Sequence, residues 1–154
     1  MKKAKWYPGK NITNAKQGLQ YKYYEVKYRS LPDFTKEKII KSGTVSNFDL
    51  SNRLVDDYFA FRFTGYIDVP AKGIYTFYLA SDDGSMLSIE NELVVDHNGL
   101  HGPTEKRGQI ALLPGKHPIV VDYFEATVGE TLEVYWEGPG IEKRKVPAAY
   151  LFHL

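Results

Sequence analysis

Two adjacent carboxylates, Asp82 and Asp83, are the residues of this sequence whose types best suit metal chemistry. Carboxylate oxygens are hard ligands of the kind that Ca²⁺ prefers. Neighbouring side chains diverge along an ordinary extended backbone, so both aspartates reach one cation only if the peptide between them takes a rare conformation. A cis peptide bond would provide one. The alternative is that Asp83 and Gly84 form a hairpin turn, which Asp82 caps through local hydrogen bonds. The residues alone leave both interpretations open.

Two histidines four residues apart, His97 and His101, form a second cluster in the sequence DHNGLH at 96–101. On a helix this spacing places both imidazoles on one face, where they can bind zinc. Asn98 and Gly99 disfavour a helix and favour a turn, so we expect His101 to form hydrogen bonds within a loop. An Asp–His pair could also serve a nucleophilic serine, but no G-x-S-x-G segment supplies one. We therefore expect neither a zinc site nor a serine hydrolase.

Glycosidase chemistry needs two carboxyl groups about 5–5.5 Å or 6.5–9.5 Å apart across the substrate. The sequence offers six candidate acids: Asp56, Asp57, Asp82, Asp83, Glu125 and Glu137. No motif pairs them or fixes which one acts as acid and which as base. The glycine-rich phosphate-binding motifs of nucleotide enzymes are absent as well. We therefore expect that this chain by itself is not an enzyme.

The balanced charge and the absence of cysteine argue against several classes of partner and site. The chain has 154 residues, with 20 Lys and Arg against 19 Asp and Glu, which leaves a formal net charge of +1. Such a balance gives no strong field that would attract nucleic acid or an anionic membrane. Cysteine is absent, which excludes disulfides and thiolate metal sites. No apolar run approaches the roughly 20 residues of a membrane span, so we expect none.

Short runs of alternating aromatic and polar residues predict the strands that position these groups. Segment 58–68 alternates so that one face carries apolar side chains: Phe59, Phe61, Phe63 and Ile67. Further strands are expected at 74–80, 86–89, 93–96, 110–113, 119–124 and 132–136, and within 18–30. Turn signals about 8–12 residues apart predict an all-β fold, an antiparallel β-sandwich or small barrel. In such a fold, chemistry belongs to the loops at the strand ends.

Three stretches lack this alternation. Residues 96–109 contain three glycines and a proline, which predicts a long surface loop. Residues 35–43 predict one helical turn or an irregular segment. Residues 1–17 are interpreted as an N-terminal arm or linker. The remaining residues, 18–154, then form one β-sandwich domain.

The order of several motifs resembles the PA-fourteen domain family, the module named after the anthrax protective antigen. These motifs are SDDGS at 81–85, D-x-x-G-x-H at 96–101, L-x-G-x-H at 113–117 and Y-F-E at 123–125. The resemblance covers nearly the whole chain from residue 18. It implies an antiparallel β-sandwich or barrel of jelly-roll type, usually a non-catalytic part of a larger protein. Bacterial members often accompany β-glucosidases and β-hexosaminidases.

The resemblance also assigns roles to residues. In the yeast adhesin branch, paired aspartates joined by a cis peptide bind a calcium ion that ligates two sugar hydroxyls, and Asp82 and Asp83 match that pair. The same branch adds an asparagine from a later loop, but here Glu125 stands near that position. Glu125 either supplies an oxygen or is the family's ordinary Y-F-E glutamate with a structural role. With His97 and His101 nearby, these residues are the predicted carbohydrate site.

The resemblance thus implies a carbohydrate-binding module, with calcium as its ion and a glycan as its partner. Its parent would be a secreted glycan-active protein found extracellularly, at the cell surface or in the periplasm. In the alternative, the chain is a structural accessory domain. It would then shape the active site of a linked catalytic domain, a β-hexosaminidase or β-glucosidase, without binding sugar itself.

Overall fold

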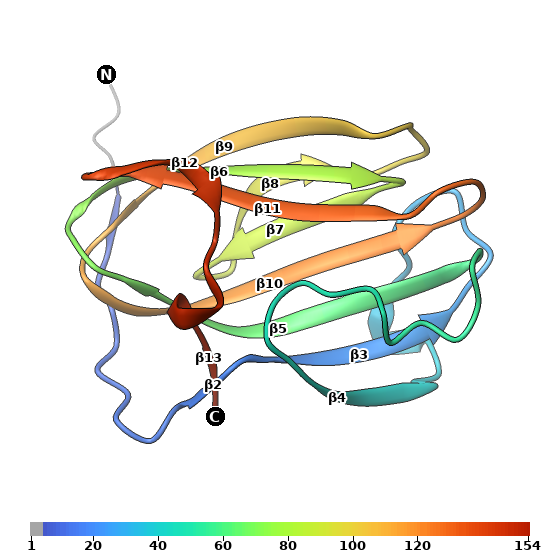
Figure 1. Cartoon of the computed structure of the whole chain (residues 1–154), viewed down its shortest axis with the longest axis horizontal. Coiled ribbons are helices and arrows are strands. Elements are labelled where there is room, and N and C mark those ends of the chain that lie inside the picture. The colour runs from blue at the N-terminus through green and yellow to red at the C-terminus, as the bar shows by residue number, and fades with distance from the viewer. Residues whose placement is uncertain (1–4) are drawn as a thin grey trace.

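The computed structural model describes residues 5–154, which form two β-sheets packed face to face (Figure 1). The first sheet has the strand order β1-β9-β6-β11-β12. Its strands are β1 Trp6–Tyr7, β9 Thr104–Leu112, β6 Gly73–Asp82, β11 Thr131–Gly138 and β12 Ile141–Lys145. Strand β1 is parallel to β9, whereas β6 is antiparallel to both β9 and β11.

The second sheet has the order β2-β13-β5-β10-β7-β8, and β3 joins it by pairing with β5 and β4. Its strands are β2 Lys16–Gln17, β3 Leu19–Glu25, β4 Lys41–Val45, β5 Phe59–Val69, β7 Ser85–Ile89, β8 Glu92–His97, β10 Gly115–Glu125 and β13 Leu151–His153. Every pairing within this sheet is antiparallel. The predicted all-β sandwich is therefore confirmed.

The core lies between the two sheets and is mostly aromatic. In β5, the four apolar side chains predicted to share one face are fully buried: Phe59, Phe61, Phe63 and Ile67. The first sheet meets them with Tyr75, Phe77 and Trp136, which also have no exposed surface. Burying aromatic side chains of this size supplies much of the hydrophobic stabilisation of such a domain.

A smaller apolar cluster covers the other face of the second sheet, near the ends of β5 and β10. Its members are Tyr24, Val26, Phe34, Ala60, Phe124 and Ala126. Phe34 begins the short 3₁₀ helix Phe34–Lys36, whose first turn is capped by the Asp33 side chain. Phe124 and Ala126 of this cluster flank Glu125, the last residue of β10, so the cluster packs beside the end of that strand.

The predictions for two segments without alternation, 96–109 and 35–43, are wrong in part, because each segment includes part of a strand. Strand β9 begins at Thr104, so only residues 98–103 of the predicted loop at 96–109 lie between strands. Residues 104–109 lack apolar alternation because most of them are exposed, and pairing with β6 keeps them extended. Residues 41–45, which fall partly in the segment predicted to be helical or irregular, form β4 and pair with β3.

The predicted arm at 1–17 lies partly outside the described residues, and its described part contributes two short strands. Strand β1 pairs with β9, and β2 pairs with β13. A further short helix, Ala148–Tyr150, precedes β13. Within residues 5–154, no helix is long and apolar enough to cross a membrane.

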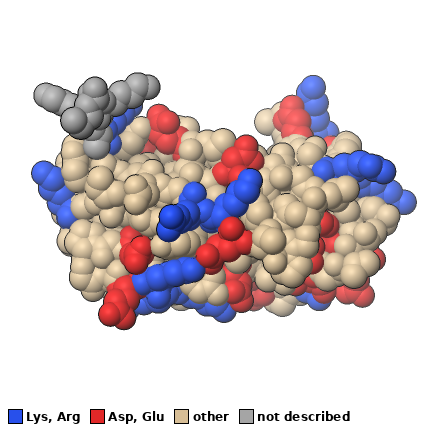
Figure 2. Space-filling model, turned by 90° about the horizontal axis from the view of Figure 1, so that it is seen from above, with Lys and Arg blue, Asp and Glu red and all other residues tan. Residues whose placement is uncertain are grey.

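Charged side chains of both signs are mixed on the face of the molecule seen in Figure 2. Two ion pairs join charges of opposite sign between strands of the first sheet: Lys143 Nζ lies 2.9 Å from Glu105 Oε2, and Lys145 Nζ lies 3.2 Å from Glu133 Oε1. Exposed pairs of this kind contribute little to stability. Figure 2 shows no large patch of one sign on the face that it presents.

Candidate metal centre

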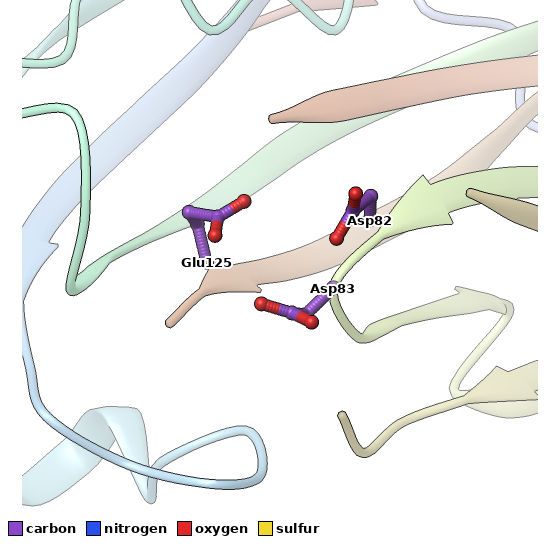
Figure 3. Close-up of side chains that lie close together, drawn as sticks. All are labelled: Asp82, Asp83 and Glu125. Atoms are coloured by element: carbon purple, nitrogen blue, oxygen red, sulfur yellow. The ribbon is translucent and has the colours of Figure 1, made fainter. Parts of the chain in front are cut away.

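Three carboxylates meet at one end of the sandwich, where β6 and β10 finish. Asp82 is the last residue of β6, Asp83 follows it across a cis peptide bond, and Glu125 ends β10. Figure 3 shows the three side chains gathered around one place between these strand ends. Each offers an oxygen, and these oxygens all lie within 4.8 Å of one another. We call this cluster the acidic triad.

The acidic triad lies just beneath the surface. Asp82 is 9% exposed, Asp83 6% and Glu125 1%. Transferring a carboxylate from water to such a site is costly unless a cation or hydrogen-bond donors balance its charge. Among the residues that the structure describes, no ion pair joins a Lys or Arg to any of the three.

Hydrogen bonds satisfy one member of the triad better than the others. Asp83 accepts through Oδ2 from the Ala126 backbone N–H at 2.9 Å and through Oδ1 from the His101 N–H at 3.3 Å. Glu125 Oε2 lies 3.4 Å from the Tyr123 hydroxyl, which also donates to the Asp82 carbonyl oxygen. Glu125 Oε1 is buried with no hydrogen-bond partner. An orphaned buried oxygen of this kind needs an explanation.

Burial and repulsion between the carboxylates raise the pKa values of two members of the triad. Burial, then the charges of Asp83 and Asp82, raise the pKa of Glu125 from its ordinary 4.5 to about 8. Burial, followed by the charge of Asp83, also raises the pKa of Asp82. Both shifts mean that the folded chain alone disfavours three ionised groups at this place. A cation placed among them reverses that preference.

The local backbone brings other loops close to the triad. A side chain at Gly84 would lie 2.3 Å from Phe124 Cε1 and 2.7 Å from the Gly99 backbone nitrogen, so only glycine fits there. Gly129 has φ +87°, and a Cβ there would lie 3.2 Å from Asp82 Oδ2. The loops at 98–103 and 126–130 therefore approach the aspartates closely. This arrangement offers hard oxygen ligands, which suit a divalent cation such as Ca²⁺.

The two histidines belong to the loop that contacts Asp83. His97 is buried, and its Nε2 lies 3.0 Å from the Thr104 carbonyl oxygen. The His101 ring stacks on it at 3.9 Å, with Nε2 2.9 Å from the His97 carbonyl and Nδ1 2.8 Å from that of Gly102. The predicted hydrogen-bonded turn is confirmed. These rings hold the loop in shape, and a direct role in sugar binding stays a prediction.

The other acids named from the sequence do not join the triad. Glu137 accepts a hydrogen bond from Tyr78 at 2.8 Å on the first sheet. Asp56 lies 3.8 Å from Arg53 on the surface. Asp57 acts on Glu125 only through its charge. Tyr123, whose hydroxyl contacts the Asp82 carbonyl oxygen and Glu125, was not predicted as a site residue, because alternation in β10 identifies it only as a core residue.

The structure defines the class of protein as a two-sheet β-sandwich with an acidic cluster at the strand ends, and sequence comparison shows the family. The PA14 domain model matches residues 15–150, so the chain belongs to the PA14 domain family. The resemblance seen in the sequence motifs is confirmed.

One curated relative is the anti-sigma-I factor RsgI3 of Acetivibrio thermocellus, which is 26% identical over 141 residues. The match covers 88% of this chain and 21% of that protein, so the chain spans about one fifth of its relative. A solved anti-sigma factor domain-containing protein from Clostridium clariflavum is 28% identical with a TM-score of 0.74. That match covers 99% of this chain and 53% of the other.

Two solved adhesin domains share the fold at lower identity. The PA14 sugar-binding domain of an RTX adhesin is 17% identical with a TM-score of 0.73, and the match covers 90% of this chain and 99% of that one. The epithelial adhesin 9 A domain of Candida glabrata, solved with Galβ1-3GlcNAc, is 14% identical with a TM-score of 0.71. That match covers 95% of this chain and 93% of the other.

Proposed function

We propose that this chain is a non-catalytic carbohydrate-binding domain whose acidic triad holds a calcium ion. One observation carries the proposal: three buried carboxylates converge within 4.8 Å, and one of their oxygens has no partner. A cation explains both the convergence and the orphaned oxygen. Calcium accepts six to eight oxygen ligands, so three side chains leave positions for other oxygens.

Each residue of the triad has a part in this proposal. Asp82 and Glu125 supply carboxylate oxygens from the ends of β6 and β10. Asp83 does the same while its hydrogen bonds to Ala126 and His101 fix the two neighbouring loops. A bound calcium ion would supply open coordination positions for vicinal sugar hydroxyls. The adhesin neighbours, described as sugar-binding or solved with a disaccharide, support this ligand class.

The parent protein is proposed to meet glycans outside the cytoplasm, extracellularly, at the cell surface or in the periplasm. The adhesins among the structural neighbours support that setting. The chain matches only part of each anti-sigma factor relative, so in those proteins a domain of this kind belongs to a longer chain. These relatives support an anti-sigma factor as the parent protein, in place of the glycoside hydrolase expected from the sequence. In that setting, glycan binding by this domain would be the input to a regulatory protein.

A structural role is the second candidate. The hydrogen bonds of Asp83 join the strand end of β6 to the loop at 98–103 and to the end of β10. These contacts favour a site whose role is to hold the two neighbouring loops in place. In that case the ion, or the aspartates alone, stabilises the loops, and the domain acts on a linked catalytic domain without binding sugar.

Calcium-dependent binding to a panel of immobilised glycans distinguishes the two candidates. The double variant Asp82→Ala Asp83→Ala should lose binding while its circular dichroism stays that of a folded sandwich. Asp56→Ala is the matched control, since that side chain is 90% exposed and lies outside the triad. Binding that survives in the double variant or in chelator would contradict the calcium site. Stabilisation by calcium without any glycan binding would favour the structural role.

A further inference from the structure

Glu125 adds a third carboxyl group to the site, and it does so from the most buried position of the triad. Its carboxylate is 1% exposed and its Oε1 has no partner. Figure 3 shows this side chain directed towards the two aspartates from the end of β10. A buried oxygen aimed into a cluster of ligands is placed to bind the same ion as they do.

The charge count of the site follows directly. Three ionised carboxylates carry three negative charges, and a divalent ion cancels only two of them. A site built from two carboxylates and a neutral amide would instead be neutral with the ion bound. Since an ion's own charge and that of its ligands act together in a metal site, the occupied triad keeps a residual negative charge.

Among residues 5–154, no Lys or Arg forms an ion pair with the triad, and the positive contribution of His101 is set against two acidic neighbours. The charges that act on Asp82 and Glu125 from outside the triad come from Glu130, Asp57 and His101. The first two are acidic. Arg53 is nearby, but its Nη2 is held 2.8 Å from Glu130 Oε1. The ring nitrogens of His101 contact carbonyl oxygens of its own loop.

We propose that Glu125 makes this site selective for uncharged sugars, and that sugar acids are repelled by the negative charge remaining around the bound ion. The inference rests on the proposed function, because it concerns the ligand of the same calcium site. Neutral vicinal hydroxyls can complete the coordination of the ion without adding charge. A uronate or a sulfated sugar adds a further negative charge at a place already rich in it.

The first test uses metal ions without sugar and compares the affinity of the site for a trivalent and a divalent ion. A triad of three carboxylates should prefer a trivalent ion, so Tb³⁺ is expected to displace Ca²⁺. Its luminescence can be excited through Tyr123, whose hydroxyl lies 3.4 Å from Glu125 Oε2. Glu125→Gln keeps the shape and removes one charge. It should reduce the affinity for Tb³⁺ more than that for Ca²⁺, whereas the exposed control Glu142→Gln should leave both unchanged.

The second test uses a matched pair of sugars, galactose and galacturonic acid, which differ in the charge at C6. With calcium present, the wild-type domain should bind the neutral sugar about tenfold more tightly, as expected for one like-charge repulsion near a protein surface. Glu125→Gln should bring the two affinities close together. Raising the salt concentration should also reduce the difference, because ions screen exposed charges.

Each outcome decides a separate point. Equal or tighter binding of the acid by the wild-type domain, or an unchanged ratio in Glu125→Gln, would overturn the selectivity. An unchanged preference for Tb³⁺ in that variant would show that Glu125 does not contact the ion and would overturn the inference at its first step. Metal binding without any binding of neutral sugar would overturn the proposed function and the selectivity with it.

Discussion

Two carboxylates three residues apart on β10 differ in their partners: Asp122, which is partly buried, pairs with an arginine, whereas the buried Glu125 does not. Asp122 faces Arg62 on β5, and the two form a bidentate pair with Nε–Oδ1 and Nη2–Oδ2 distances of 2.8 and 3.0 Å. The guanidinium also lies over the Phe34 ring at 4.7 Å. Glu125 lies at the end of the same strand beside two further acids and has no cation.

Asp122 is neutralised by an arginine of the same domain and stabilises the fold, whereas Glu125 is placed to bind a cation from solution. Removing an ion pair from water is costly, and good bidentate geometry is what compensates for it. The Arg62–Asp122 pair is complete within the chain. In the described part of the chain no Lys or Arg pairs with the acidic triad, so we expect its stability to depend on the ions in solution.

Calcium is expected to produce the largest effect. A ligand that binds only the folded state at a thousand times its dissociation constant adds about 4.1 kcal/mol to the free energy of unfolding. In a domain of this size, that raises the Tm by about 8–16 °C. Thermal scans of chelator-treated protein with and without calcium measure the shift. Asp82→Asn should abolish it without disturbing a hydrogen bond of the fold, and a shift that persists in this variant would refute the site.

Breaking the complete pair is expected to cost somewhat less, whatever ions are present. Arg62→Met leaves Asp122 with two acceptors unpaired and should lower the free energy of unfolding by about 2–3 kcal/mol, reduced from the fully buried case because Arg62 is partly exposed. Urea unfolding measures it. Adding Asp122→Leu to this variant should recover much of the loss, and Arg107→Met is the exposed control. A calcium-dependent cost would break the distinction drawn between the two regions.

The pH dependence of the metal-free protein should come from the triad. Because the pKa of Glu125 is raised from 4.5 to about 8, the folded state keeps a proton over that range that the unfolded state has lost. The free energy of unfolding therefore falls as pH rises from about 5 to about 8. We expect a loss of about 2 kcal/mol, discounted from the full shift because water reaches a site so near the surface.

Chemical unfolding at several pH values in chelator measures this slope. Glu125→Gln should flatten it, and saturating calcium should flatten it as well, because the bound ion keeps Glu125 ionised. A slope that is unchanged in Glu125→Gln would assign the titration to another group.

The sequence predicted the strands that position the site more reliably than the site itself. Alternation in 58–68 and 119–124 identified β5 and β10 because half-buried strands repeat every two residues. It could not identify residues 104–109 as a strand, since they are mostly exposed and depend on β6 for their pairing. Hydrogen bonding between distant strands leaves no local pattern.

For the site, the motif SDDGS singled out Asp82 and Asp83, but the residues alone left both a metal site and a capped turn open. The choice depends on a cis peptide and on the end of β10, more than 40 residues away. Glu125 was one of six candidate acids in the sequence and was assigned to this site only through the family resemblance. The role of Tyr123 was missed, because a tyrosine in an alternating strand gives no sign of where its hydroxyl points.

The smallest expected effect concerns backbone strain in the loop at 126–130, next to the acidic triad. Val128 has φ +62° and is 84% exposed, in the loop beside Gly129. A β-branched residue is disfavoured in this conformation by about 1–2 kcal/mol, and glycine is not. Because glycine also gains entropy in the unfolded chain, Val128→Gly should stabilise the domain by only about 0.5 kcal/mol.

Urea unfolding of Val128→Gly and of the neighbouring control Thr127→Gly measures this difference. Thr127 is exposed and does not have a positive φ, so its replacement by glycine should destabilise the domain by a few tenths of a kcal/mol, at most about 1. Opposite signs in adjacent residues would place the strain in the backbone of the loop over the triad. If Val128→Gly destabilises as Thr127→Gly does, the positive φ carries no cost there, and the two regions differ in charge alone.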